Sequence, residues 1–179
     1  MNKIKNSTKT FIWRVTTTHT ISYFFAGIFA LLVLRYDKRF GYGALSFMRS
    51  TESPWVAAGM GLQIVRGIIL SLFLLPFKEV FINTKKGWVK FWFLLFGLGY
   101  LITISPAIGS FEGIIYTNIP MEFHLLGIPE IILYMILFAT LMWGWYKKPN
   151  KIFNILSMVF LSLIILMSVM GVLDSLGLI

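Results

Sequence analysis

Residues 123–173 decide the fold of this chain. They read FHLLGIPEIILYMILFATLMWGWY, then KKPNK, then IFNILSMVFLSLIILMSVMGVL. The two apolar runs are 24 and 22 residues long, and Glu130 is the single charged residue within them. A helix needs about 20 apolar residues to cross the roughly 30 Å hydrocarbon core of a bilayer. The stretch therefore predicts two transmembrane helices joined by a short basic turn.

Three more apolar runs precede this stretch, and the six tryptophans fall near the ends of runs, where their amphipathic rings anchor at a membrane interface. The turns between runs are too short to form another domain, so residues 1–179 are expected to form one all-α bundle embedded in a lipid bilayer. The five predicted membrane-spanning helices are Phe11–Leu34, Trp55–Phe77, Phe91–Ile108, Phe123–Tyr146 and Ile152–Leu173.

The composition agrees with a membrane protein. Of the 179 residues, 58% are hydrophobic and only 13% are charged, whereas a soluble domain has about a quarter of charged residues. The chain has no cysteine, which excludes disulfides, thiolate metal ligands and cysteine nucleophiles. The net charge of +9 is attributed to cytoplasmic loops and not to nucleic-acid binding, because no basic stretch has a groove-reading pattern.

The basic residues predict the orientation. Lysines and arginines gather before the first run, after the second and after the fourth, and none occurs between Phe91 and Tyr146. The positive-inside rule then places the N-terminus in the cytoplasm and the C-terminus outside. The basic loop 35–49 opposes this assignment, unless it lies flat on the membrane. Small size and the lack of a targeting extension favour the plasma membrane of a prokaryote.

Arg66 lies at the middle of the second run, about 16 Å from either interface. A central arginine costs about 2.5–3.5 kcal/mol on insertion scales and usually faces a partner or a wet cavity. Gln63 shares its helix face, and Glu130 of the fourth run lies at a similar depth. We expect Arg66 to pair with Glu130 and to bind a ligand. The alternative is an arginine that only ties helices together.

Two further sets of polar residues extend this hypothetical site. In the first run, His19 and Tyr23 lie on one helix face, and Tyr134 follows Glu130 by one turn in the fourth. A polar lining is one interpretation, and a hydrogen-bonded core histidine is the other.

The connection at residues 105–119 is apolar but interrupted by Pro106 and two glycines, which predicts a re-entrant or interface-lying segment between the third and fourth helices. Glu112 and Tyr116 in this segment, with His124 just after it, are expected to cap a pocket above Arg66 and Glu130. An ordinary outer loop with solvated acids is the alternative.

No metal motif occurs, because Glu-x-His at residues 122–124 is not a specific ligand spacing, and no cofactor fingerprint is present. Three classes of function remain. The first is binding or translocation of a small polar or anionic solute at Arg66 and Glu130, reached from the outer side. The second is an intramembrane enzyme acting on a lipid or lipid-linked substrate. The third is a non-catalytic subunit of a membrane complex. Its partners in that complex are other membrane proteins or further copies of the same chain.

Overall fold

The computed structural model describes residues 7–179, and every regular element within that part of the chain is a helix. Four helical stretches there are long and apolar enough to cross a membrane. They correspond to the first, second, fourth and fifth predicted runs, so the sequence-based expectation of an all-helical membrane protein is confirmed for these four. Their bounds are Thr8–Leu32, Pro54–Ile82, Met121–Lys147 and Lys151–Ser175.

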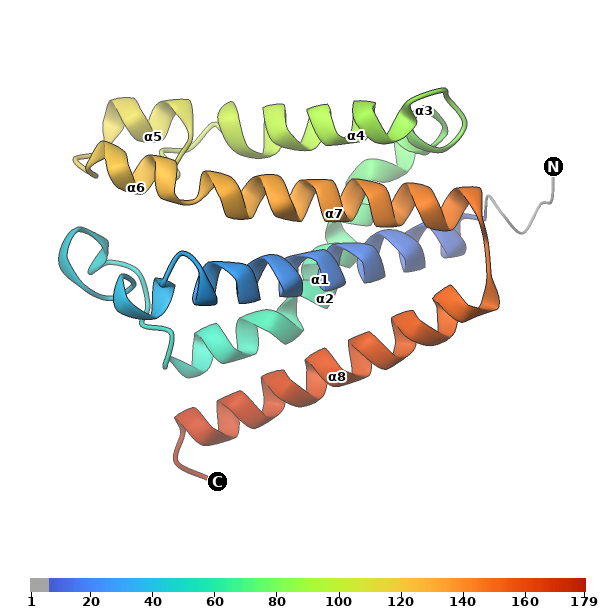
Figure 1. The fold of residues 1–179 in the computed structure, drawn as a ribbon. Coiled ribbons are helices and arrows are strands. Elements are labelled where there is room, and N and C mark those ends of the chain that lie inside the picture. Colours follow the sequence, from blue (N-terminus) through green and yellow to red (C-terminus); the bar gives the residue numbers. More distant parts are fainter. Residues whose placement is uncertain (1–6) are drawn as a thin grey trace.

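Local signals in the sequence begin these helices. Ser7 accepts a hydrogen bond from the backbone of Thr10, Asn150 does the same for Ile152, and Pro54 occupies the first turn of its helix. Figure 1 shows the arrangement of the elements. The helices are α1 (Thr8–Leu32), α2 (Pro54–Leu74), α3 (Lys78–Ile82), α4 (Gly87–Phe96), α5 (Phe111–Tyr116), α6 (Met121–Leu126), α7 (Ile128–Lys147) and α8 (Lys151–Ser175).

The third predicted run is helical over less of its length than expected. It forms α4 and a π-helical turn at Gly97–Leu101, which together rise about 22 Å. The chain from Ile102 to Ser110 has no regular helix, contrary to the predicted run to Ile108. Two glycines in the turn and Pro106 beyond it explain the early end, because both residue types disfavour a continued helix. The chain then forms α5 and α6.

Helix α7 packs between α4 and α1, α1 packs between α7 and α2, and α8 packs against α2 and also contacts α1. Figure 1 shows α1 beside α7, with α2 crossing behind them and α8 on the opposite side of α1 from α4. Because α1 lies between α2 and α7, it is the most buried of the four long helices. Its buried hydroxyls need partners, and Thr17, Thr18 and Thr20 each donate to a backbone carbonyl one turn earlier.

Small residues allow the close helix contacts. A side chain on Gly67 of α2 would lie 2.9 Å from Cα of Thr16 in α1. On the other side of α2, Ser168 of α8 donates to the carbonyl of Ala57 at 2.7 Å and accepts from the backbone of Gly61 at 3.2 Å. Such contacts replace the hydrophobic driving force that lipid does not supply between membrane helices.

A compact apolar core forms at the end of the bundle where α1 begins and α7 ends. It is rich in phenylalanines, and Phe91 packs edge to face on Phe138 and at a tilt against Phe81. Its buried members are Phe11, Val15, Leu74, Phe81, Phe91, Phe138, Ala139, Met142 and Tyr146.

The contact at Gly67 yields a stability prediction. Gly67→Ala should lower the free energy of unfolding by about 1–3 kcal/mol, because the new methyl group meets the backbone of Thr16. Gly59→Ala in the same helix is the matched control, since a methyl group there has open space and should leave stability unchanged or raise it. Unfolding of both variants in mixed micelles measures the difference, and equal stabilities would contradict this packing.

Candidate functional site

His19 joins three helices at the middle of the bundle. The imidazole is fully buried on α1. Its Nδ1 lies 2.7 Å from the hydroxyl of Tyr134 on α7, and its Nε2 lies 3.3 Å from Oε1 of Gln63 on α2. The amide nitrogen of Gln63 donates to the carbonyl of Gly59 at 3.2 Å, which orients the amide oxygen toward His19.

These partners indicate which nitrogen of His19 carries the hydrogen. An amide oxygen only accepts, so Nε2 of His19 donates to Gln63. The neutral imidazole then accepts at Nδ1, and the Tyr134 hydroxyl donates to it. Aromatic rings fill the rest of the surroundings, with Tyr134 and Phe138 edge-on to the imidazole at centroid distances of 5.6 and 5.7 Å. His19 is thus held as a neutral, fully bonded residue.

Arg66 lies at the edge of this group. Its Nη1 donates to Oε1 of Gln63 at 3.5 Å, and its Cζ lies 5.8 Å from the ring centroid of Tyr23. The predicted face of α2 is present, since Gly67 and Ser71 are buried and Gln63 is half-buried. The guanidinium itself is exposed in the isolated chain, and within residues 7–179 it forms no ion pair.

The predicted pairing of Arg66 with Glu130 is wrong. The carboxylate of Glu130 instead accepts a hydrogen bond from the hydroxyl of Tyr36 at 2.8 Å. Helical rise placed the two charged residues at similar depth, but it carried no information about their lateral positions. Helix α1 packs between α2 and α7, and the two side chains bond to different partners, Arg66 to Gln63 and Glu130 to Tyr36.

Sequence reasoning missed Tyr36, because it lies in the connection between α1 and α2 and matches no motif. Burial, with the nearby negative charge of Glu130, raises the pKa of Tyr36. The phenol therefore stays protonated and keeps donating to the carboxylate. A tight turn presents it, in which Arg35 has a left-handed backbone with φ of 56° and precedes the one-turn helix Tyr36–Lys38.

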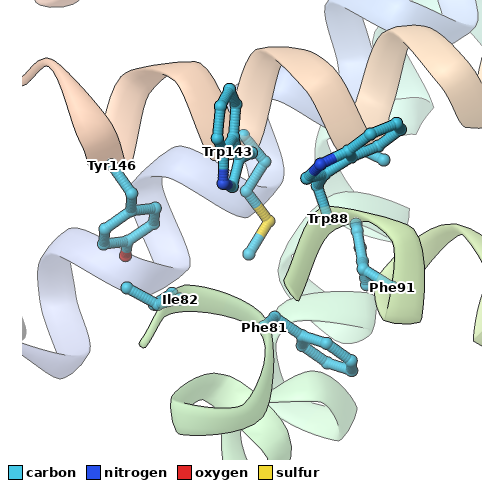
Figure 2. Close-up of a pocket in the computed structure, with 8 residues that line it drawn as sticks. Phe81, Ile82, Trp88, Phe91, Trp143 and Tyr146 are labelled. Carbon is cyan, nitrogen blue, oxygen red and sulfur yellow. The ribbon is translucent and has the colours of Figure 1, made fainter. Parts of the chain in front are cut away.

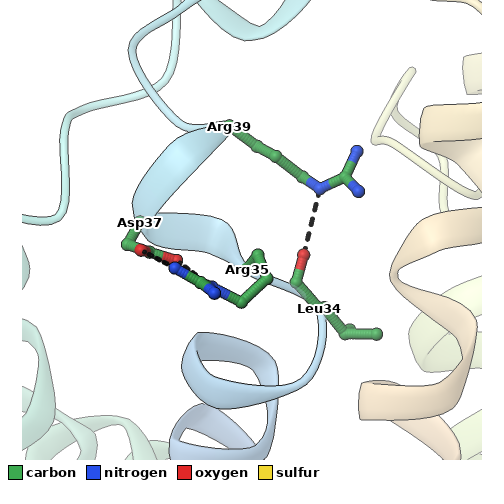
Figure 3. A network of polar contacts seen from close by, with 4 residues as sticks. All are labelled: Leu34, Arg35, Asp37 and Arg39. Carbon is green, nitrogen blue, oxygen red and sulfur yellow. Dashed lines mark hydrogen bonds and ion pairs between the residues drawn. The ribbon is translucent and has the colours of Figure 1, made fainter.

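Two arginines stabilise this turn (Figure 3). Arg35 donates to both carboxylate oxygens of Asp37, at 3.1 and 2.9 Å, and these hydrogen bonds lower the pKa of Asp37. Arg39 donates through Nε to the carbonyl of Leu34 at 3.0 Å. The pair of Arg35 and Asp37 is the one ion pair found within residues 7–179. It stabilises the connection that holds Glu130.

The predicted outer residues form a separate structural group. His124 is buried in α6, accepts at Nδ1 from the backbone of Gly109 at 3.0 Å and has Thr117 at 3.4 Å from Nε2. Glu112 is half-buried and Tyr116 is exposed on α5. In the described part of the chain, no hydrogen bond or ion pair joins these residues to Arg66 or Glu130. His124 therefore fastens the connection between α4 and α7.

Over residues 7–179, no three histidine or acidic side chains gather in a way that could hold a metal ion. The chain matches no protein-family model, no curated protein and no solved structure.

The contacts described above define the candidate centre. It consists of His19, Tyr23, Gln63, Arg66 and Tyr134, with Glu130 one turn from Tyr134 on α7.

Removing one hydroxyl tests the His19 network. Tyr134→Phe should lower the free energy of unfolding by about 1–3 kcal/mol, because Nδ1 of His19 is left buried without a donor. Tyr116→Phe is the matched control, since that tyrosine is 73% exposed. Unfolding in micelles measures both variants, and a Tyr134→Phe protein as stable as the control would show that the hydrogen bond contributes nothing.

Proposed function

We propose that this chain is a polytopic membrane protein that binds or translocates a small polar or anionic solute at the centre around Arg66. The observation that carries the proposal is a guanidinium in the middle of a spanning helix that has an amide and an aromatic face beside it but no carboxylate within residues 7–179. A cation at such depth is costly unless an anion or water accompanies it. An anionic solute would supply that partner.

The surrounding residues support a role in orientation. Gln63 is fixed by His19 and Gly59, so its amide oxygen holds the Arg66 side chain. Tyr23 lies within electrostatic reach of both Arg66 and Glu130. In this proposal the solute occupies the space beside Arg66 and Tyr23. Glu130 lies toward the outer end of the proposed site. Its negative charge there repels anions, so only an anion that binds to Arg66 overcomes this repulsion.

The proposed topology has five spans, with the N-terminus cytoplasmic, the C-terminus outside and the chain in a prokaryotic plasma membrane. Helix α4 with its π-helical turn is the third span in chain order, and it is short and lies beside α7. Lys3 and Lys5, which contribute to the orientation argument, lie outside the described residues.

One observation favours a second candidate, a non-catalytic subunit of a larger membrane complex. Arg66 is exposed on the isolated chain, so an acid of a partner protein could occupy the position proposed for the solute. The enzyme hypothesis has less support, because His124 and Glu112 share no interaction with Arg66 in the described structure.

Anion binding by the purified protein tests the proposal. Sodium acetate and disodium succinate, added at constant ionic strength, should raise the thermal unfolding midpoint of the wild type. Arg66→Gln should raise the half-saturating concentration at least about tenfold, because a hydrogen bond to a charged group contributes about 1.5–3 kcal/mol. Arg49→Gln is the matched control, since Arg49 also lies over an aromatic ring, that of Trp55 at 5.5 Å, but outside the long helices.

The proposal fails if Arg66→Gln and Arg49→Gln respond to both anions as the wild type does. Native mass spectrometry of the same samples examines the second candidate. An Arg66→Gln protein that loses a co-purifying protein partner, with no anion response in the wild type, would establish the subunit role in place of solute binding.

A further inference from the structure

Arg14 is a second arginine inside a spanning helix, and the surroundings of its guanidinium differ from those of Arg66. Its side chain is only 6% exposed and lies six residues after the start of α1, hence about 9 Å into the helix. Its Nε and Nη1 are buried, and neither has a hydrogen-bond partner within residues 7–179. A buried donor without an acceptor is costly and uncommon in folded proteins.

The residues around Arg14 have the same deficiency. The Cζ of Arg14 lies 4.4 Å from the ring centroid of Tyr146 and 5.3 Å from that of Trp145, both on α7. These contacts stabilise the charge. They leave Nε and Nη1 of Arg14 unbonded, however, and Nε1 of Trp145 also lacks a partner in the described chain. All three of these groups can only donate, so they need acceptors that the described chain does not supply.

An apolar pocket adjoins the cluster at Tyr146 (Figure 2). It is a small, partly open hollow between α3, α4 and α7, and its walls are almost entirely aromatic and aliphatic. In Figure 2, Tyr146 and Trp143 extend from α7, while Ile82 and Trp88 approach from α3 and α4. The pocket and the donor cluster therefore meet at one residue, with an apolar side and a cationic side.

The charge at this end of the bundle is strongly positive. The connections that flank the pocket contain Lys85, Lys86, Lys147 and Lys148. Glu79 is the acid in the helix beside the pocket, and its carboxylate is engaged by the amide of Asn83. Basic pockets between membrane helices are typical of sites for anionic lipid head groups.

We propose that Arg14, Trp145 and Tyr146 bind the phosphate group of an anionic phospholipid, whose apolar part lies against the adjoining apolar hollow. A phosphate offers several acceptor oxygens for the N–H groups that lack them. The depth of Arg14 near a helix end matches the region where head groups lie. Inorganic phosphate carries the same chemistry, and the pocket beside Tyr146 favours the lipid as the source.

Tryptophan fluorescence of the full chain in micelles tests the site, because Trp145, Trp88 and Trp143 surround it. The protein is titrated with dioctanoyl phosphatidylglycerol, dioctanoyl phosphatidylcholine and inorganic phosphate. Phosphatidylglycerol should saturate at the lowest concentration. Arg14→Gln should raise that concentration at least about tenfold, and Arg14→Lys, which keeps the charge but loses the planar fork, should give an intermediate value.

Two variants keep the test decisive if Arg14→Gln does not fold. Tyr146→Phe removes a hydroxyl of the site and keeps the aromatic ring beside Arg14, so it should weaken lipid binding severalfold. Lys151→Gln removes an exposed charge at the same end and should bind as the wild type does. Saturation by inorganic phosphate alone, lost with Arg14, would identify a soluble phosphate as the ligand in place of the lipid. Equal binding by the wild type, Arg14→Lys and Tyr146→Phe would overturn the site.

Discussion

The close approach of α1 and α2 at Gly67 is the contact on which the arrangement depends. Because no side chain separates the backbones there, the imidazole of His19 reaches Gln63 on α2 while it also bonds to Tyr134 on α7. One neutral histidine thereby fixes three helices relative to one another. Thr17, Thr18 and Thr20 of α1 satisfy their hydroxyls within the helix, which helps a polar helix to occupy the centre of an apolar bundle.

The two intramembrane arginines show two ways of holding a cation in a bundle. Arg66 extends from the edge of the His19 network and is exposed, with an amide and a tyrosine ring beside it. Arg14 is enclosed by two aromatic rings at the basic end, beside an apolar pocket. Neither has a carboxylate partner within residues 7–179. This shared lack of a carboxylate partner is the basis of the two anion sites that we propose.

Two of the acids, in contrast, stabilise the connection after α1. Glu130 anchors the turn after α1 through Tyr36, and Asp37 holds the same turn through Arg35. These bonds engage the carboxylates of Glu130 and Asp37, so neither carboxylate pairs with Arg14 or Arg66. His124 has a comparable role at the other connection, where it fastens the backbone at Gly109. The polar residues thus form two groups. One group secures the connections between helices, and the other lies in the middle of the bundle and at its basic end.

The sequence by itself determined the helical class, four of the long apolar helices and the polar faces of α1, α2 and α7, because hydrophobic length and helical spacing are local properties. It also identified His19, Gln63, Arg66 and Tyr134 as candidates for one centre. The packing of the helices against one another decided which partners the polar side chains meet. With α1 between α2 and α7, Glu130 bonds to Tyr36 and not to Arg66, and Arg14 meets Trp145 and Tyr146. Lateral positions arise from packing between distant segments, on which depth along a helix carries no information.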